Sequence, residues 1–158
     1  MFPVMNNLRQ LQAYRDNQLT TTDSGTVLLM LYQGAIDAIK QAKIDMASGN
    51  MASKGKEILR ATDIINQFIA SLDYEVGGDL AHNLEALYRY MLEQLLAANA
   101  YNDHQALDTV LSLLVTLKSG WDEAVVAQRK KAAQGNYNEA KKEVETELDM
   151  RRTRRANG

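Results

Sequence analysis

The chain has 158 residues and a net charge of −2, and its 46% apolar and 24% charged residues are typical of one soluble globular domain, with or without a tail. The absence of cysteine excludes disulfides and thiolate metal sites. No apolar run approaches the roughly 18 residues of a membrane span, and the first ten residues lack the pattern of a secretory signal. We therefore expect a cytoplasmic protein that does not insert into membranes.

The first segment, residues 1–22, is polar with scattered apolar residues and is expected to form an N-terminal arm or cap. Leu8, Leu11 and Tyr14 are three residues apart, which suits a short helix or a docked arm. The stretch 20–25 (TTTDSG) is rich in helix-capping residues and predicts a polar break. Residues 23–130 are expected to form a helical bundle, and residues 131–158 a charged tail.

Four amphipathic helices are predicted within the bundle, at roughly 26–46, 53–72, 79–101 and 103–130. In each, apolar residues recur three or four positions apart and so share one face of a helix. These stripes are Leu28, Leu31, Tyr32, Ala35, Ile39, Ala42 and Met46; Ile58, Ala61, Ile65, Phe68 and Leu72; Leu80, Leu84, Leu87, Tyr88, Met91, Leu95 and Ala98; and Leu107, Val110, Leu111, Leu114, Leu117, Trp121 and Val125.

Short polar or glycine-containing stretches separate these helices. Residues 48–50 (SGN) end the first, and Gly77-Gly78 is expected to form the corner between the second and the third. Asn102, with Gln105 three residues later, resembles a capping box at the start of the fourth. Comparable helix lengths with short loops predict an all-α protein: an antiparallel, up-down-up-down four-helix bundle with a short N-terminal helical arm and a partly helical, charged C-terminal extension.

The C-terminal extension differs from the bundle in charge and pattern. Residues 125–158 have nine basic and five acidic residues, a net charge of +4, whereas residues 1–124 have a net charge of −6. The stretch AAQGNYNEA is expected to interrupt the helix. Residues 138–150 are expected to be helix-prone, with a thin stripe of Tyr137, Ala140, Val144 and Leu148, and the basic end (RRTRRANG) is expected to be disordered. A nucleic-acid-binding tail is one interpretation; a solvated tail is favoured because no aromatic residues lie among the basic ones.

Residues that could support catalysis or metal binding are few. The two histidines, His82 and His104, fall in the first turns of predicted helices, where exposure is expected, and no Glu-x-x-His motif occurs. There is no Gly-x-Ser-x-Gly motif and no phosphate-binding loop. We therefore expect no enzyme activity, no metal and no cofactor; a small helical enzyme or carboxylate-metal protein is the alternative.

The helices contain more large apolar residues than one core stripe each requires. Taken together, these residues indicate apolar grooves, which can receive amphipathic helices from a partner. A structural homo-oligomer would use the same surfaces, and this alternative stays open. The additional residues are Leu29, Met30, Tyr90, Leu92, Leu96 and Leu113.

Several motifs resemble those of the FliS family of flagellin export chaperones. In order, they are Ala13-Tyr14 with Gln18, LLMLYQGAI at 28–36, SLDYEVGGDLAHNL at 71–84, LYRYM at 87–91, Ala98-Asn99 and Trp121. The resemblance covers roughly residues 13–125. This chain departs from the family in having Ser24-Gly25 where Ser-Pro is usual and Gln33 where an aspartate is common.

The resemblance implies a cytoplasmic, flagellin-specific chaperone of bacterial flagellum biogenesis. Such a protein binds the disordered C-terminal segment of flagellin, prevents premature polymerisation and delivers flagellin to the flagellar type III export apparatus. It further implies an arm that covers part of the binding surface, contact with an export gate component, and a monomer or weak dimer that binds no nucleic acid. We assign flagellin binding to Tyr14 and Gln18 in the arm and to Leu28, Leu29, Met30, Tyr32, Tyr88, Tyr90 and Leu92 in the grooves.

Overall fold

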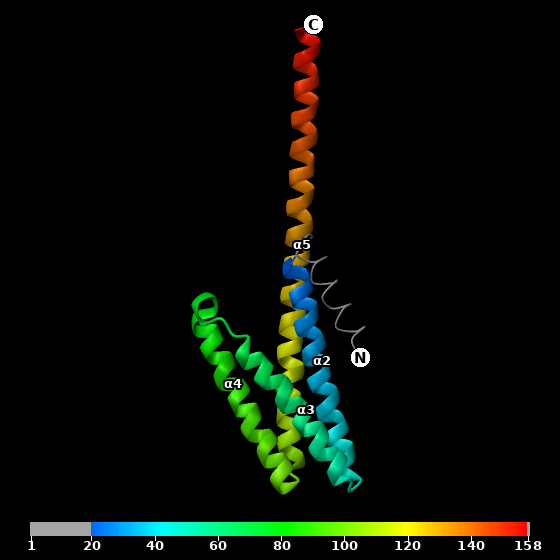
Figure 1. The fold of residues 1–158 in the computed structure, drawn as a ribbon, viewed down its shortest axis with the longest axis vertical. Helices are drawn as coiled ribbons and strands as arrows, with labels where there is room; N and C mark the ends of the chain where they lie inside the picture. The colour runs from blue at the N-terminus through cyan, green and yellow to red at the C-terminus, as the bar shows by residue number, and fades with distance from the viewer. Residues whose placement is uncertain (1–19, 158) are drawn as a thin grey trace, which may run out of the picture. The chain divides into compact units, whose positions relative to one another are not determined.

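The computed structural model describes the backbone of residues 20–157 and the side chains of residues 24–157. This part of the chain consists of four helices and has no strand: α2 (Thr20–Ala47), α3 (Met51–Ala70), α4 (Tyr74–Tyr101) and α5 (His104–Ala156) (Figure 1). The expected arm, with Tyr14 and Gln18, lies outside the described residues. The chain divides into two compact units, residues 26–121 and the combination of residues 1–25 with 122–158.

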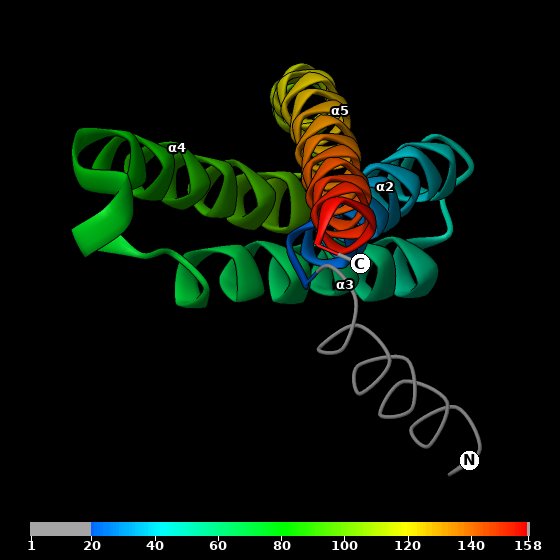
Figure 2. The same ribbon diagram turned by 90° about the horizontal axis from the view of Figure 1, so that it is seen from above.

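Residues 26–121 confirm the predicted four-helix arrangement. Successive helices run in opposite directions, as the views in Figures 1 and 2 show. Most residues of each apolar stripe face the interior, because their burial removes apolar surface from water at about 25 cal/mol per Å². The largest fully buried side chains come from all four helices: Tyr32, Ile39, Ile65, Met91, Leu95, Leu107, Val110 and Leu114.

Buried polar groups join the helices at the end of this unit where α4 meets α5. The Lys54 ammonium is buried and donates to the Asn99 carbonyl (3.0 Å) and the Asn102 Oδ1 (2.7 Å). Asn102 is the left-handed C-cap of α4, with φ of 51°, and Asp103 caps α5 by accepting from the backbone of Gln105 and Ala106. The predicted capping box is therefore wrong: Asn102 ends one helix, and Asp103 begins the next.

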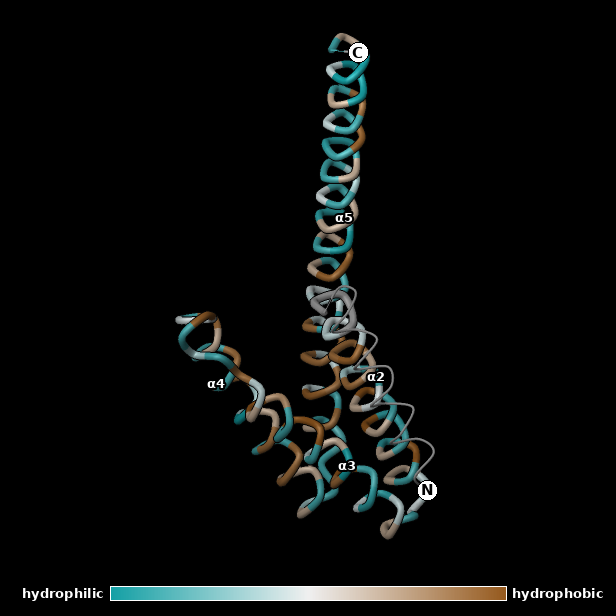
Figure 3. Tube along the Cα trace, turned by 45° about the horizontal axis from the view of Figure 1, so that its top comes forward, coloured by the Kyte–Doolittle hydropathy of each residue, from teal (hydrophilic) through white to brown (hydrophobic). Residues whose placement is uncertain are grey.

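Helix α5 is continuous over 53 residues, so the predicted interruption at AAQGNYNEA and the predicted disordered basic end are both wrong. Gly135 lowers helix stability by about 1 kcal/mol relative to alanine, but good helix formers surround it. Gln134 also donates to Asn138 one turn later, at 3.0 Å. In Figure 3, hydrophilic colour dominates this part of α5, in contrast to the apolar stripes of residues 26–121.

Helix α2 begins at Thr20, so the predicted polar break at residues 20–25 is wrong as well. Within the unit formed by the two ends of the chain, Gly25 packs against Val125. A Cβ at Gly25 would lie 2.6 Å from the Val125 Cγ2, which is closer than carbon atoms can approach. Glycine therefore permits the contact that buries Val125.

Candidate functional site

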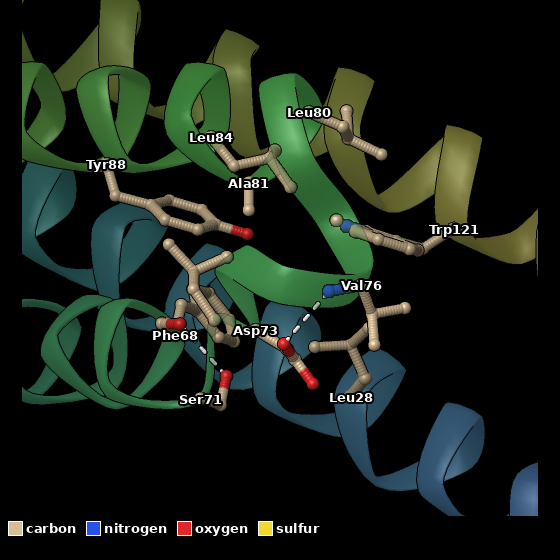
Figure 4. Close-up of a pocket in the computed structure, with 12 residues that line it drawn as sticks. Leu28, Phe68, Ser71, Asp73, Val76, Leu80, Ala81, Leu84, Tyr88 and Trp121 are labelled. Carbon is tan, nitrogen blue, oxygen red and sulfur yellow. Dashed lines mark hydrogen bonds between the residues drawn. The ribbon is translucent and has the colours of Figure 1, made fainter.

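An apolar hollow of about 260 Å³ lies where α3 ends and α4 begins (Figure 4). Val76 and Leu80 lie at its exposed edge, with 86% and 59% of their surfaces exposed. Phe68 and Tyr88 form its buried floor. An apolar cavity of about 150 Å³ can hold a benzene molecule, so this hollow can accept a side chain of leucine or phenylalanine size. Its full lining is Leu28, Phe68, Ser71, Leu72, Asp73, Val76, Gly77, Leu80, Ala81, Leu84, Tyr88 and Trp121.

The short connection between α3 and α4 shapes the hollow. The Ser71 hydroxyl donates to the Phe68 carbonyl at 2.9 Å, which satisfies an acceptor at the end of α3. The Asp73 carboxylate then accepts from the backbone N–H groups of Glu75 (3.0 Å) and Val76 (3.1 Å), as an N-cap does. The chain therefore leaves α3 at residues 71–73, forms the short turn Tyr74–Gly77, and turns back at the predicted corner, where Gly78 departs from helical geometry (Figure 4).

The two glycines form this corner within the first turns of α4. Gly78 has φ of 50° and ψ of −124°, which separates the turn Tyr74–Gly77 from the rest of the helix. A Cβ on Gly77 would lie 2.8 Å from the Ala81 Cβ, so this turn folds closely over the helix that follows. Val76 and Leu80 lie on either side of this bend at the exposed edge of the hollow, with Trp121 between them in Figure 4.

Polar contacts hold this turn in place. The Tyr74 hydroxyl donates to the Glu85 carboxylate at 2.7 Å, and the Tyr74 ring lies 4.8 Å from the His82 ring. Arg89 also donates to Glu85. These bonds from Tyr74 and Arg89 lower the pKa of Glu85, and the bond to Glu85 raises the pKa of Tyr74.

Hydrogen bonds join three aromatic side chains at the base of the hollow. The Tyr32 and Tyr88 hydroxyls are 2.5 Å apart, and the Trp121 Nε1–H donates to the Tyr32 hydroxyl at 3.1 Å. Phe68 stacks on Tyr32, with ring centroids 4.3 Å apart. Burial raises the pKa of both tyrosines, so both hydroxyls are neutral at physiological pH.

A second apolar depression, of about 320 Å³, runs between α3 and α4 and is called the α3–α4 groove here. Leu59 and Leu96 form its exposed sides, and Ile58 and Leu95 are buried in its base. Gly55 lines the groove next to Asn99, and a Cβ there would make an ordinary van der Waals contact with the Asn99 Oδ1, at 3.7 Å. The groove is lined by Gly55, Ile58, Leu59, Thr62, Asn66, Leu92, Leu95, Leu96 and Asn99.

Apolar side chains predominate in the linings of both depressions. Within residues 20–157, no three histidine, aspartate or glutamate side chains gather as they would around a metal ion. The buried Asp45 carboxylate accepts from Ser53 and Gln41, and so serves the packing of helix ends. None of the four helices, over the same residues, is long and apolar enough to cross a membrane.

The predicted binding residues fall into four groups. Leu28 and Tyr88 line the hollow, and Leu92 lines the α3–α4 groove. Leu29 is half-buried, while Met30 and Tyr90 are exposed, and these three line neither depression. Tyr32 is fully buried beneath the hollow. Tyr14 and Gln18 lie outside the described residues.

Sequence reasoning included Leu96 among the groove residues but missed Val76, Leu80 and Leu59 at the edges of the two depressions. Leu80 was assigned to the core stripe, but it is exposed, because the bend at Gly78 turns the start of α4 outward. Val76 was not considered at all. The sequence does contain a signal: Asp73 is a strong N-cap residue placed just before an apolar residue and two glycines. Leu72, Leu59 and Trp121 also belong to the edges or linings.

Comparisons with known proteins agree with this architecture. The family model described as "Flagellar protein FliS" matches residues 5–129. The flagellar secretion chaperone FliS of Vibrio cholerae is 40% identical over 117 residues, covering 72% of this chain and 86% of the relative. The flagellar secretion chaperone FliS of Bacillus subtilis is 29% identical, covering 75% and 87%.

A solved structure shows the same fold. The crystal structure of a flagellar chaperone from bacteria superposes with a TM-score of 0.64 at 16% identity, covering 77% of this chain and 98% of that one. The similarity therefore extends over nearly the whole of the solved chain. The last part of α5, from residue 130 onward, lies outside the segment that the family model matches.

Proposed function

The chain belongs to the FliS family of flagellar proteins, whose relatives named above are flagellar secretion chaperones, and we propose that it binds the disordered C-terminal segment of flagellin. In this proposal the bound segment cannot polymerise prematurely in the cytoplasm. The chaperone then delivers flagellin to a component of the flagellar type III export gate. The role is one of binding and release, without catalysis.

The apolar hollow is the observation that supports this proposal most strongly. Its exposed edge (Val76 and Leu80) and its buried aromatic floor (Phe68 and Tyr88) offer an apolar site for a side chain from an amphipathic helix. The α3–α4 groove offers a second such site on the same unit of residues 26–121. Two separate depressions suit a partner with several apolar anchors along one segment.

The energetics suit a chaperone that must release its client. Burying one leucine-sized anchor contributes about 1.5–3 kcal/mol. Ordering a disordered segment costs about 2–5 kcal/mol. Two or more filled depressions can therefore offset the ordering cost, and loss of a single anchor makes the complex much weaker.

The structure suggests different roles for the predicted binding residues. We assign direct contact to Leu28 and Leu92, which line the two depressions. Tyr32 and Tyr88 support the floor of the hollow from below, through their hydrogen bond. Met30 and Tyr90 are exposed positions at which an extended client could continue beyond the depressions. Tyr14 and Gln18 stay assigned to the arm.

The test is a calorimetric titration of the full chain with a peptide covering the C-terminal segment of the same organism's flagellin. We expect saturable one-to-one binding with a negative heat-capacity change, which is the signature of apolar burial. Leu80→Glu and Leu96→Glu should each weaken binding roughly tenfold or more, because each places a charge beside one depression.

Ile44→Glu is the matched control. Ile44 is 62% exposed, close to the 59% of Leu80, but it lines neither depression. This variant should bind like the wild type, and circular dichroism should show that all three variants remain helical. A well-folded wild-type protein that does not bind the peptide would refute the proposed function. Equal losses in all three variants would refute the assignment of the site.

A further inference from the structure

Residues 126–148 of α5 have an apolar face that no other described residue covers. Its members, called the tail stripe here, fall within about 80° of one another around the helix at 100° per residue. Tyr137 and Val144 are 62% and 58% exposed. The tail stripe is Val126, Ala133, Tyr137, Ala140, Val144 and Leu148. Such a narrow stripe is typical of the seam of a two-stranded coiled coil.

Charged residues beside the tail stripe are arranged in blocks of opposite sign. Residues 129–131 (RKK) are basic, and residues 143–149 include three glutamates and one aspartate with no basic residue. A parallel pair of such helices would place like charges together, whereas an antiparallel pair places each basic block beside an acidic one. The charge pattern therefore selects a second copy of the same helix in the antiparallel direction.

One antiparallel register satisfies the apolar and the charged residues together. With the two-fold axis between residues 138 and 139, Ala133 faces Val144 of the second copy, and Tyr137 faces Ala140. At the centre of the pair, Tyr137 and Val144 thus each meet an alanine, as interdigitated packing requires. In the same register Lys130 of one copy lies within one turn of Glu145 of the other copy, and both are on the same flank of the seam. On the other flank, Arg129 of one copy lies close to Glu147 of the other copy. Glu147 also pairs with Arg151 of its own helix, at 3.5 Å.

We propose that the tail stripe is a self-association surface, on which a second copy of this chain pairs antiparallel as a two-stranded coiled coil. This surface differs from the hollow and the α3–α4 groove, and it lies almost entirely beyond the segment matched by the family model. The proposal therefore does not depend on flagellin binding. Pairing buries the exposed Tyr137, Val144 and Leu148, which accounts for apolar residues on a helix that is otherwise highly charged.

The first test measures the mass of the full chain by analytical ultracentrifugation over a wide concentration range. Lys130→Glu alone and Glu145→Lys alone should each weaken dimerisation roughly tenfold or more, because each replaces both symmetry-related ion pairs with like charges. The double variant Lys130→Glu/Glu145→Lys should recover association. An equimolar mixture of the two single variants should recover it too, because the heterodimer restores both pairs.

Lys142→Glu is the matched control, since it makes the same change of charge on the face of the helix opposite the tail stripe, and it should dimerise like the wild type. A wild-type chain that stays monomeric at every concentration overturns the proposal. This is the result expected if a different protein, and not a second copy, covers the tail stripe. Single variants that dimerise normally also overturn it, as does a mixture that fails to recover association.

Disulfide trapping tests the register directly, because the chain has no cysteine of its own. Ala133→Cys mixed with Val144→Cys should form a disulfide-linked heterodimer. Ala133→Cys alone should not, because the two copies of residue 133 would be ~16 Å apart along the axis. Efficient crosslinking of Ala133→Cys with itself indicates a parallel pair and overturns the proposed geometry.

Discussion

Residues 26–121 and residues 122–156 are both helical, but different interactions stabilise the two regions. In the first region, wide apolar stripes from four helices are buried against one another. In the second, nearly every residue of α5 is exposed; apart from Val125, which packs against Gly25, its described interactions include ion pairs within the helix, Glu147–Arg151 and Asp149–Arg152. The difference shows that a helical sequence pattern alone does not indicate a core: the width of the apolar stripe decides whether a helix packs within its own chain.

The largest expected effect compares two leucines of the same helix. Leu114→Ala should lower the free energy of unfolding by about 2–5 kcal/mol, because Leu114 is fully buried and its removal leaves a cavity. Leu148→Ala, measured in dilute solution where the chain is monomeric, should change it by less than about 0.5 kcal/mol. Urea denaturation measures both. Equal losses would show that the two parts of α5 are stabilised alike and would contradict the comparison.

Lys54 tests the buried polar contacts of the first region. Lys54→Met keeps the aliphatic chain but removes the donor to Asn99 and Asn102, so we expect a loss of about 1.5–3 kcal/mol. The exposed Lys56 provides the control, and Lys56→Met should be nearly neutral. If both variants unfold at the same urea concentration, the Lys54 contacts do not stabilise the unit.

The buried tyrosines make the stability of residues 26–121 depend on pH in the alkaline range. Burial raises the pKa of Tyr32 and Tyr88 above the unfolded value near 10, so the folded state holds these protons more strongly than the unfolded state. Their contribution to stability is complete below about pH 10 and is lost as the pH rises above it. Thermal melts between neutral pH and pH 11 should show this decline.

Tyr32→Phe sharpens this test. It removes the acceptor for Trp121 and the partner of Tyr88, and should cost about 1–2 kcal/mol at neutral pH. The decline above pH 10 should also be shallower, because one titrating group is gone. Tyr90→Phe, at an exposed position, should change neither quantity. An unchanged alkaline decline in Tyr32→Phe would show that other groups cause it.

The smallest expected effect compares two glycines of α5. Nothing lies within 4 Å of a Cβ built on Gly120 or Gly135, so alanine fits at both and favours the helix by about 0.5–1 kcal/mol. Gly120→Ala should raise the stability of the whole bundle, as measured by urea denaturation. Gly135→Ala should instead slow hydrogen exchange only in its own part of α5. A global gain from Gly135→Ala would mean that the two regions unfold together.

Much of the fold could be predicted from the sequence, because burial of apolar stripes determines it. Ile39, Ile65, Met91 and Leu107 were assigned to the core from their spacing, and all four are buried. The continuity of α5 could not be predicted in this way. There the weak helix preference of Gly135 competes with favourable neighbours and with local bonds such as Gln134 to Asn138, and sequence patterns do not show which prevails.

The site was harder to predict because exposure at a helix end depends on backbone geometry. Leu80 continues the apolar stripe of α4, yet it follows the bend at Gly78, whose φ is positive, and is exposed. From residue type and position in the stripe, Tyr32 and Tyr88 could equally be side chains that contact a partner at the surface. In the structure they are buried, and their hydroxyls form a hydrogen bond with each other. Only the structure distinguishes an aromatic floor from an aromatic surface.

Hydrogen exchange of the full chain, with and without the flagellin C-terminal peptide, tests the central claim most directly. If the apolar hollow receives the client, saturating peptide should slow exchange at residues 71–80, where Asp73 caps α4 and Gly78 interrupts it. Exchange at residues 132–156 should stay the same at constant protein concentration. Saturation that slows exchange only in residues 132–156, or leaves residues 71–80 unchanged, would contradict the assignment of client binding to the hollow.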